Sequence, residues 1–388
     1  MVARPADPAE RILGIDALRG IALCGILLIN IFDMGGPVAM DRPITVPTMN
    51  DPDWQVWTIA QLFVSGTMRG LFSMLFGVGL VLFLDRGPAA QRMPLYIRRL
   101  GWLFLFGIVD STLLLWPGDI LLVYAMAGAI LLMLYRLDSA RLIAIAATTL
   151  IMLSIWSALE ASAIVYADTV YSPAMMAREG AARLGGYADN LAYMSVVAWA
   201  WTVNAFTLRW IGDAAAFMLI GVVLQRRGLF AADVNLRLVR WITVLGYAVG
   251  LSLRAAHTLS ILGHEGTPTI VSALIDQPGR LAMTLGHYGL FVLLWRRRAM
   301  RRACAPLVQM GRMALTLYLG QSACGALLFA GFGLGLWNSL SWPQLWGVAA
   351  AVLVGQAIFA SLWLRRYRYG PMEWLWRRGT YGKRPSEA

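Results

Sequence analysis

Residues 10–30 read ERILGIDALRGIALCGILLIN, and this stretch decides the fold class. Its apolar middle is long enough to cross the hydrocarbon core of a bilayer, which is about 30 Å thick. It is also too long for the apolar core of a cleaved signal peptide, so it is predicted to remain as a membrane anchor. Asp16, Arg19 and Asn30 lie within or at the ends of this segment, and their presence there requires an explanation.

The rest of the chain has the same apolar character. Its 388 residues are 59% hydrophobic and only 14% charged, with a mean hydropathy of +0.63. These values exclude a soluble domain of this length. The net charge of +12 lies in short basic clusters between apolar runs, which indicates membrane topology and not nucleic-acid binding. Cys24, Cys304 and Cys324 have no paired spacing and no neighbouring His, so no disulfide framework and no metal site are predicted.

The hydropathy pattern predicts an all-α bundle of about ten transmembrane helices. The predicted spans are 13–34, 67–84, 97–116, 120–136, 142–164, 210–226, 239–260, 279–295, 306–330 and 343–364. Two aromatic, amphipathic segments near 55–66 and 190–208 are predicted as part-spanning or interfacial helices. One integral domain, 1–388, is expected, with N-terminal helices in 12–208 and C-terminal helices in 209–388.

Basic residues are retained on the cytoplasmic side of a membrane and therefore predict the orientation. With the N-terminus inside, the inner segments hold 24 of the 33 Lys and Arg residues. The outer loops hold three, Arg42, Arg178 and Arg183. Both termini are accordingly predicted to be cytoplasmic, and the C-terminal segment is predicted to be a basic, aromatic tail on that side.

Segments 77–107 and 220–246 resemble each other faintly. The similarity indicates either an internal repeat of helix pairs or two inner hairpins that happen to end in Arg-Gly. The sequence SGTMRG, residues 65–70, is a candidate helix break.

Ionisable groups at membrane depth cost at least about 2.5 kcal/mol each, so each should face the bundle interior with a partner. Asp16 and Arg19 share a helix face, and Asn30 returns to that face three turns later. Either Asp16 caps the helix while Arg19 reaches the interface, or this face lines a ligand site. Arg312 is predicted at the depth of Arg19. Two such arginines imply a shared anion, which is a carboxylate such as Asp16, a phosphate or a lipid headgroup.

A second set of ionisable residues is predicted in the outer half of the bundle. Its members are Arg69, Asp110, Asp119, Arg209, Asp213, Arg254, His257, Arg280 and His287. Asp119 follows Trp-Pro-Gly and is predicted to cap a helix. Arg209 and Asp213 are four residues apart and are predicted to form an ion pair. Asp110 has no nearby turn to explain it. His257 and His287 are either satisfied core residues or proton carriers.

Five motifs resemble one bacterial family over nearly the whole chain. They are IDALRGIALCGILLINI (15–31), LFSMLFGVGL (71–80), LLLWPGDILLVYAMAG (113–128), GRMALTLYLGQS (311–322) and RRYRYGPMEWLWRRGTYG (365–382). Together they resemble the YeiB-like proteins of the bacterial inner membrane, catalogued as domain of unknown function 418. The resemblance implies a multi-pass protein of that membrane, which has been linked to transport.

The opening helix also resembles that of the transmembrane acyltransferases, on Asp16, Arg19, Gly20 and Asn30. That resemblance implies an acyl-CoA donor on the cytoplasmic side and an acceptor across the membrane or linked to a lipid. The chain departs from the acyltransferases because segment 35–54 contains no His. It departs from many YeiB-like proteins in having Asp110 where they carry His, and Leu317 where they carry Asn.

Three functional hypotheses follow. The first is a membrane acyltransferase that holds an acyl-CoA-like donor with Asp16, Arg19, Asn30 and Arg312, and that uses Asp110 or His287 as proton acceptor. The second is a transporter or lipid flippase with the same polar path. The third is a sensor or assembly factor. Membrane lipids are expected partners of each, and nucleic acid is not.

Overall fold

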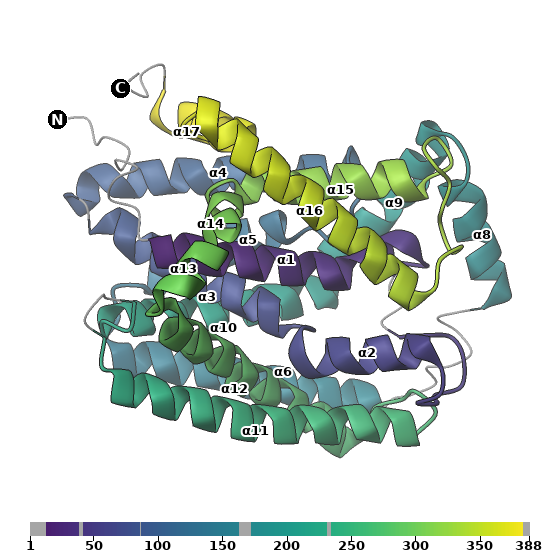
Figure 1. Ribbon diagram of the computed structural model, residues 1–388, viewed down its shortest axis with the longest axis horizontal. Helices are drawn as coiled ribbons and strands as arrows, with labels where there is room; N and C mark the ends of the chain where they lie inside the picture. The colour runs from purple at the N-terminus through teal and green to yellow at the C-terminus, as the bar shows by residue number, and fades with distance from the viewer. Residues whose placement is uncertain (1–12, 39–41, 86, 163–171, 231–233, 383–388) are drawn as a thin grey trace.

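The computed structural model describes residues 13–38, 42–85, 87–162, 172–230 and 234–382, and these form helices joined by short loops (Figure 1). The helices are α1 (Leu13–Gly35), α2 (Pro52–Phe63), α3 (Thr67–Leu84), α4 (Ala89–Thr112), α5 (Ile120–Leu134), α6 (Ser139–Ser162), α8 (Pro173–Arg183), α9 (Tyr187–Val203), α10 (Ala205–Arg226), α11 (Leu236–Gly263), α12 (Ile270–Trp295), α13 (Arg298–Ala303), α14 (Ala305–Arg312), α15 (Ala314–Phe329), α16 (Trp342–Arg366) and α17 (Pro371–Tyr381). The predicted all-α membrane fold is confirmed.

The described part of each predicted span falls mainly on one helix, except 306–330, which falls on α14 and α15, and the spans differ in character. Among the described residues, six segments are long and apolar enough to cross a membrane: α1, α2 with α3, α6, most of α10, α11 and α16. α5 and α15 are apolar but shorter, with 15 and 16 residues. The predicted amphipathic segments near 55–66 and 190–208 fall on α2 and α9.

The helix ends that carry the predicted inner arginine clusters gather at one end of the bundle, on the left in Figure 1, where α1 begins and α13 and α17 lie. Contacts join these ends: Arg226, at the end of α10, donates 2.6 Å to the Leu137 carbonyl oxygen between α5 and α6. At the opposite end, the Asn338 N–H donates 2.6 Å to the Gly35 carbonyl oxygen, where α1 ends. The bundle therefore has one strongly basic end.

Two apolar segments are broken helices. The predicted break in 65–70 is confirmed, because Gly66 adopts a left-handed φ of 68° between α2 and α3. A Cβ at position 66 would lie 2.1 Å from Arg280 Nε, so the position needs glycine for space as well. The prediction of one helix over 306–330 is wrong. Met313, with φ −114° and ψ 26°, separates α14 from α15 because an outside carboxylate caps the start of α15, as described below.

α1 and α14 touch backbone to backbone. A Cβ at Gly20 would lie 2.1 Å from the Leu307 carbonyl oxygen, and one at Gly311 would lie 1.8 Å from the Asp16 carbonyl oxygen. Only glycine at both positions permits this approach, which in a membrane supplies dispersion contacts where the hydrophobic effect is weak. The contact fixes the neighbouring Arg19 and Arg312 on the same side of the crossing.

α3 and α10 cross just as closely, at equivalent positions. A Cβ at Gly77 would lie 2.0 Å from the Met218 carbonyl oxygen, and one at Gly221 would lie 2.0 Å from the Met74 carbonyl oxygen. Each glycine thus meets the residue three positions before the other. The contact joins the beginnings of the two segments whose sequences resemble each other, 77–107 and 220–246.

We expect Gly20→Ala to lower the free energy of unfolding by roughly 1–3 kcal/mol, because the added methyl must push α14 away from α1. Thermal unfolding in detergent, followed by tryptophan fluorescence, measures the change. Gly355→Ala on α16 is the matched control, since no atom lies within 4 Å of its added Cβ. The control should be neutral or slightly stabilising, and equal losses in both variants would contradict the crossing.

Candidate functional site

The break between α2 and α3 leaves backbone carbonyls without helical partners, and side chains from α11 and α12 supply the missing donors. Arg254 donates to the Gln61 carbonyl oxygen and, at 3.2 Å, to that of Ser65. His287 Nε2 contacts the Phe63 carbonyl oxygen at 2.9 Å. Arg280 donates 3.3 Å to the Gly66 carbonyl oxygen, which also accepts from the Gly70 N–H of α3. Arg280 and His287 of α12 therefore both contact carbonyl groups at this break.

The ion pairs formed by Arg209 and Asp213 differ from the sequence prediction. Arg209 pairs with Glu160 at 2.6 Å, and Asp213 instead accepts from Arg280 at 3.1 Å and from Arg69 at 3.2 Å. The predicted Arg209–Asp213 pair is wrong, because α6 and α12 bring stronger partners than the same helix offers.

A cavity of about 630 Å³, here named the Arg69 cavity, adjoins the α2–α3 break. Its lining includes four arginines, three carboxylates, two glutamines and several tryptophans: Arg42, Arg69, Arg209, Arg280, Asp33, Glu160, Asp213, Gln61, Gln277, Trp57, Trp116, Trp201, Trp210 and Trp342. Asn30 of α1 also lines it. The cavity is large enough for a small organic molecule, with aromatic surface and charged groups of both signs.

A second cavity, of about 220 Å³ and here named the Arg312 cavity, lies toward the basic end. Four arginines line it, namely Arg19, Arg99, Arg312 and Arg377, together with one carboxylate, Glu373. Arg99 stacks on Trp376, with its guanidinium carbon 4.1 Å from the ring centre. Asp16 is 4% exposed and pairs with Arg19 at 2.9 Å, as the three-residue spacing predicts. The lining is strongly cationic.

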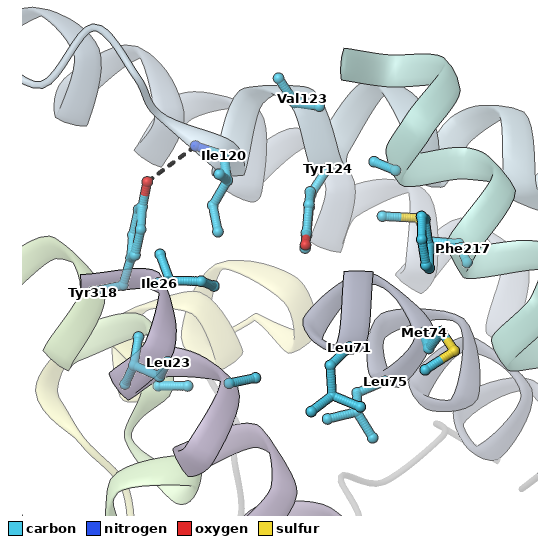
Figure 2. Close-up of a cluster of buried hydrophobic side chains, with 14 of the residues drawn as sticks. Leu23, Ile26, Leu71, Met74, Leu75, Ile120, Val123, Tyr124, Phe217 and Tyr318 are labelled. Carbon is cyan, nitrogen blue, oxygen red and sulfur yellow. Dashed lines mark hydrogen bonds between the residues drawn. The ribbon is translucent and has the colours of Figure 1, made fainter. Parts of the chain in front are cut away.

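The two cavities share lining residues on α5. Ile120 and Tyr124 line both of them. Figure 2 shows these side chains pointing toward apolar residues of α1 and α3, among them Ile26 and Leu71. The Tyr124 hydroxyl is fixed by Ser73 Oγ at 2.7 Å and by the Arg69 carbonyl oxygen at 3.1 Å. Two buried side chains, Ile120 and a fixed Tyr124, are thus common to both cavities.

Glu373 of α17 caps the start of α15 from outside the helix. One of its oxygens accepts from the Leu315 N–H at 2.8 Å and the Thr316 N–H at 3.1 Å, and the other accepts from the Thr316 hydroxyl at 2.5 Å. Burial raises the pKa of Glu373, and the hydrogen bonds from Thr316 and Leu315 act in the opposite direction. The carboxylate satisfies donors that the break before α15 exposes.

Asp110, at the end of α4, is fully buried beside Asp119 and Ser322. Asp119 caps α5, as predicted, by accepting from the Leu122 N–H at 2.7 Å. Asp110 lines neither cavity, but Gly118 and Ile120, on either side of Asp119, line the Arg69 cavity. The carboxyl pair therefore lies one layer behind that cavity wall.

The sequence predicted only part of the grouping of residues around the two cavities. Arg19 and Arg312 share one cavity as predicted, whereas Asn30 opens into the other. His287 lines neither of these cavities and has no contact in common with Asp110: its Nδ1 lies 2.8 Å from the Tyr247 hydroxyl. Glu373 was missed as a functional position, although the motif GPMEWLWRR marked its segment.

Both cavities lie inside a polytopic helical bundle, which defines an integral membrane protein with a polar interior. Residues 224–383 match the model of a family described as protein of unknown function (DUF418). The chain is 28% identical to the uncharacterized protein YeiB of Escherichia coli, over 96% of both chains. It is also 28% identical to the uncharacterized protein YxaH of Bacillus subtilis, over 97% of this chain and 96% of YxaH.

These similarities confirm the predicted resemblance of the chain to the YeiB-like proteins and to the DUF418 family. An uncharacterized 39.9 kDa protein in the amylase 3' region of Bacillus acidopullulyticus is 27% identical over 97% of this chain and 95% of its own length. No solved structure matches the chain.

We expect Glu373→Ala to lower the free energy of unfolding by roughly 1–3 kcal/mol, because two buried N–H groups of α15 lose their acceptor. Glu373→Gln retains one oxygen acceptor and should lose less. Thermal unfolding in detergent measures both, and limited proteolysis reports whether α17 detaches. Equal stability of the alanine variant and the parent would contradict the cap.

We expect His287→Leu to lower the free energy of unfolding by roughly 0.5–1.5 kcal/mol, because the Phe63 carbonyl oxygen at the α2–α3 break loses one of two donors and keeps the Thr67 hydroxyl. His287→Gln keeps a donor and should remain close to the parent. Thermal unfolding of the two variants separates a hydrogen-bonding role from a role of the imidazole itself. Similar losses in both would show that the ring, and not the donor, is required.

Proposed function

We propose that the protein is a transmembrane acyltransferase, in which an acyl-CoA-like donor enters the Arg312 cavity and an acceptor occupies the Arg69 cavity. The observation that supports this most directly is that the two cavities meet at Ile120 and Tyr124. A narrow acyl-bearing arm could cross one side-chain layer between them. The acyltransferase-like residues Asp16, Arg19 and Gly20 lie at the donor side of this arrangement.

Charge favours the same direction of transfer. The Arg312 cavity lies toward the basic end of the bundle, which the positive-inside rule assigns to the cytoplasm, where acyl-CoA is available. Arginine binds phosphate through paired N–H donors, so Arg19 and Arg312 suit the phosphates of such a donor. At about 220 Å³ the cavity suits the pantetheine arm better than the whole nucleotide.

The chemistry needs one proton acceptor. The acceptor's oxygen or nitrogen bonds to the thioester carbonyl carbon, the carbon–sulfur bond breaks, and the acceptor's proton ends on the departing thiol. Asp110 is our candidate for holding that proton in transit. It is buried beside Asp119, and a carboxylate in an apolar setting can act as a proton acceptor for a hydroxyl or amine.

A transporter or lipid flippase is the second candidate, because two of the helices are broken. Discontinuous helices next to a polar cavity are typical of secondary transporters, and here α2–α3 adjoins the Arg69 cavity while α14–α15 adjoins the Arg312 cavity. In that function Tyr124 and Ile120 would be the gate.

Ligand-dependent thermal stabilisation tests the donor site. We expect a long-chain acyl-CoA to raise the unfolding midpoint of the purified protein, by about 2.7 kcal/mol of stability at a concentration 100 times its Kd. Arg312→Ala should abolish the rise. Arg301→Ala, which removes an exposed arginine at the same end that does not line the cavity, should retain it.

The other outcomes decide between the candidates. Stabilisation by anionic lipids alone, with no response to acyl-CoA or free CoA, would contradict a donor site and favour a lipid flippase. An acyl-CoA response that survives Arg312→Ala would place the donor elsewhere in the bundle.

A further inference from the structure

Two arginines share one carboxylate oxygen in the wall of the Arg69 cavity. Arg69 of α3 and Arg280 of α12 both contact Asp213 Oδ2, at 3.2 and 3.1 Å. Arginine remains protonated in proteins, so this cluster of three side chains carries one uncompensated positive charge. A net charge buried in a membrane protein is costly unless something pairs with it.

The nearest further charges do not cancel the excess, because Asp33 and Arg42, which also line the cavity, add one charge of each sign. Asp276 influences Arg280, but it is already paired with Arg254 at 2.5 Å. With Asp276 and Arg254 included, the cluster contains three arginines and two aspartates, so its net charge is still positive. Arg209 and Glu160, on the same cavity, form a balanced pair of their own. Among the residues that the structure describes, Asp213 is the one carboxylate that forms an ion pair with Arg69.

The excess charge is directed into the cavity. The side chains of Asp213 and Arg280 are 3% and 7% exposed, whereas that of Arg69 is 32% exposed. Arg280 is held in place by Gln277 at 2.9 Å and by the Gly66 carbonyl oxygen. Arg69 makes one hydrogen bond from its guanidinium, to Asp213, so the rest of that group can bind a ligand.

We propose that the Arg69 cavity binds a molecule through an anionic group, a phosphate or a carboxylate, that pairs with Arg69. Asp213 and Arg280 are positioning residues, which hold the guanidinium toward the cavity. The tryptophans of the lining offer an apolar surface to the rest of that molecule. The proposed anion site is argued from this geometry alone. That its ligand is the acceptor of an acyl group is the one part that rests on the proposed function.

Inorganic phosphate is the first probe, added at constant ionic strength to the purified protein carrying Arg312→Ala, which weakens the other cavity as an anion site, and the comparison with Arg69→Gln isolates the Arg69 cavity. We expect a rise in the unfolding midpoint, and about a tenfold or greater loss of apparent phosphate affinity when Arg69→Gln is added. Acetate tests a carboxylate, and a short-chain phosphatidic acid tests a lipid phosphate against the free ion.

The matched control is the double variant Arg209→Gln with Glu160→Gln, which changes the same cavity but leaves its net charge unaltered. It should keep the phosphate response. Arg69→Lys, which retains the charge, should keep a weakened response, and it decides the question if Arg69→Gln does not fold.

No anion response in the parent, or a response unchanged by Arg69→Gln, would overturn the anion site. Acyl-CoA stabilisation measured on protein with an intact Arg312 reports the donor site separately. Failure of one site is therefore distinguishable from failure of the other.

Discussion

The direct contact between the backbones of α1 and α14 is the constraint on which the rest of the interior depends. Gly20 and Gly311 allow it, and each is followed or preceded in the sequence by an arginine. The same contact that brings the helices together therefore delivers Arg19 and Arg312 to one cavity. The close packing of the helices and the cationic lining of the cavity thus depend on two adjacent residues in each helix, so a change in one affects the other.

Breaking a helix within a membrane exposes backbone groups that lipid cannot satisfy, and both breaks here use distant side chains for this purpose. Arg254, Arg280 and His287 serve the carbonyls between α2 and α3, and Glu373 serves the N–H groups at the start of α15. This requirement divides the intramembrane polar residues into two kinds. Some complete a broken backbone, and others, such as Arg69, retain unused hydrogen-bonding capacity that faces a cavity.

Local pattern was enough to predict the helices, the cap at Asp119 and the pair of Asp16 with Arg19, because each depends on residues within one or two turns. It failed where partners are remote. Asp213 has suitable spacing to Arg209 but pairs with residues 144 and 67 positions away. The break at Met313 was invisible because its cause, Glu373, lies on another helix. The sequence could not show that the polar residues of α1 line two separate cavities, because Asn30 and Arg19 share one face of the helix.

The cap on α15 also has a consequence for the order in which the protein is made. Glu373 lies 58 residues after Leu315, so α15 emerges from the ribosome well before its carboxylate partner exists. Until α17 is synthesised and docks, the first N–H groups of α15 need water or lipid headgroups as substitutes. The basic end of the bundle is consequently completed last, and the cationic cavity closes only after the hydrophobic helices have already been inserted.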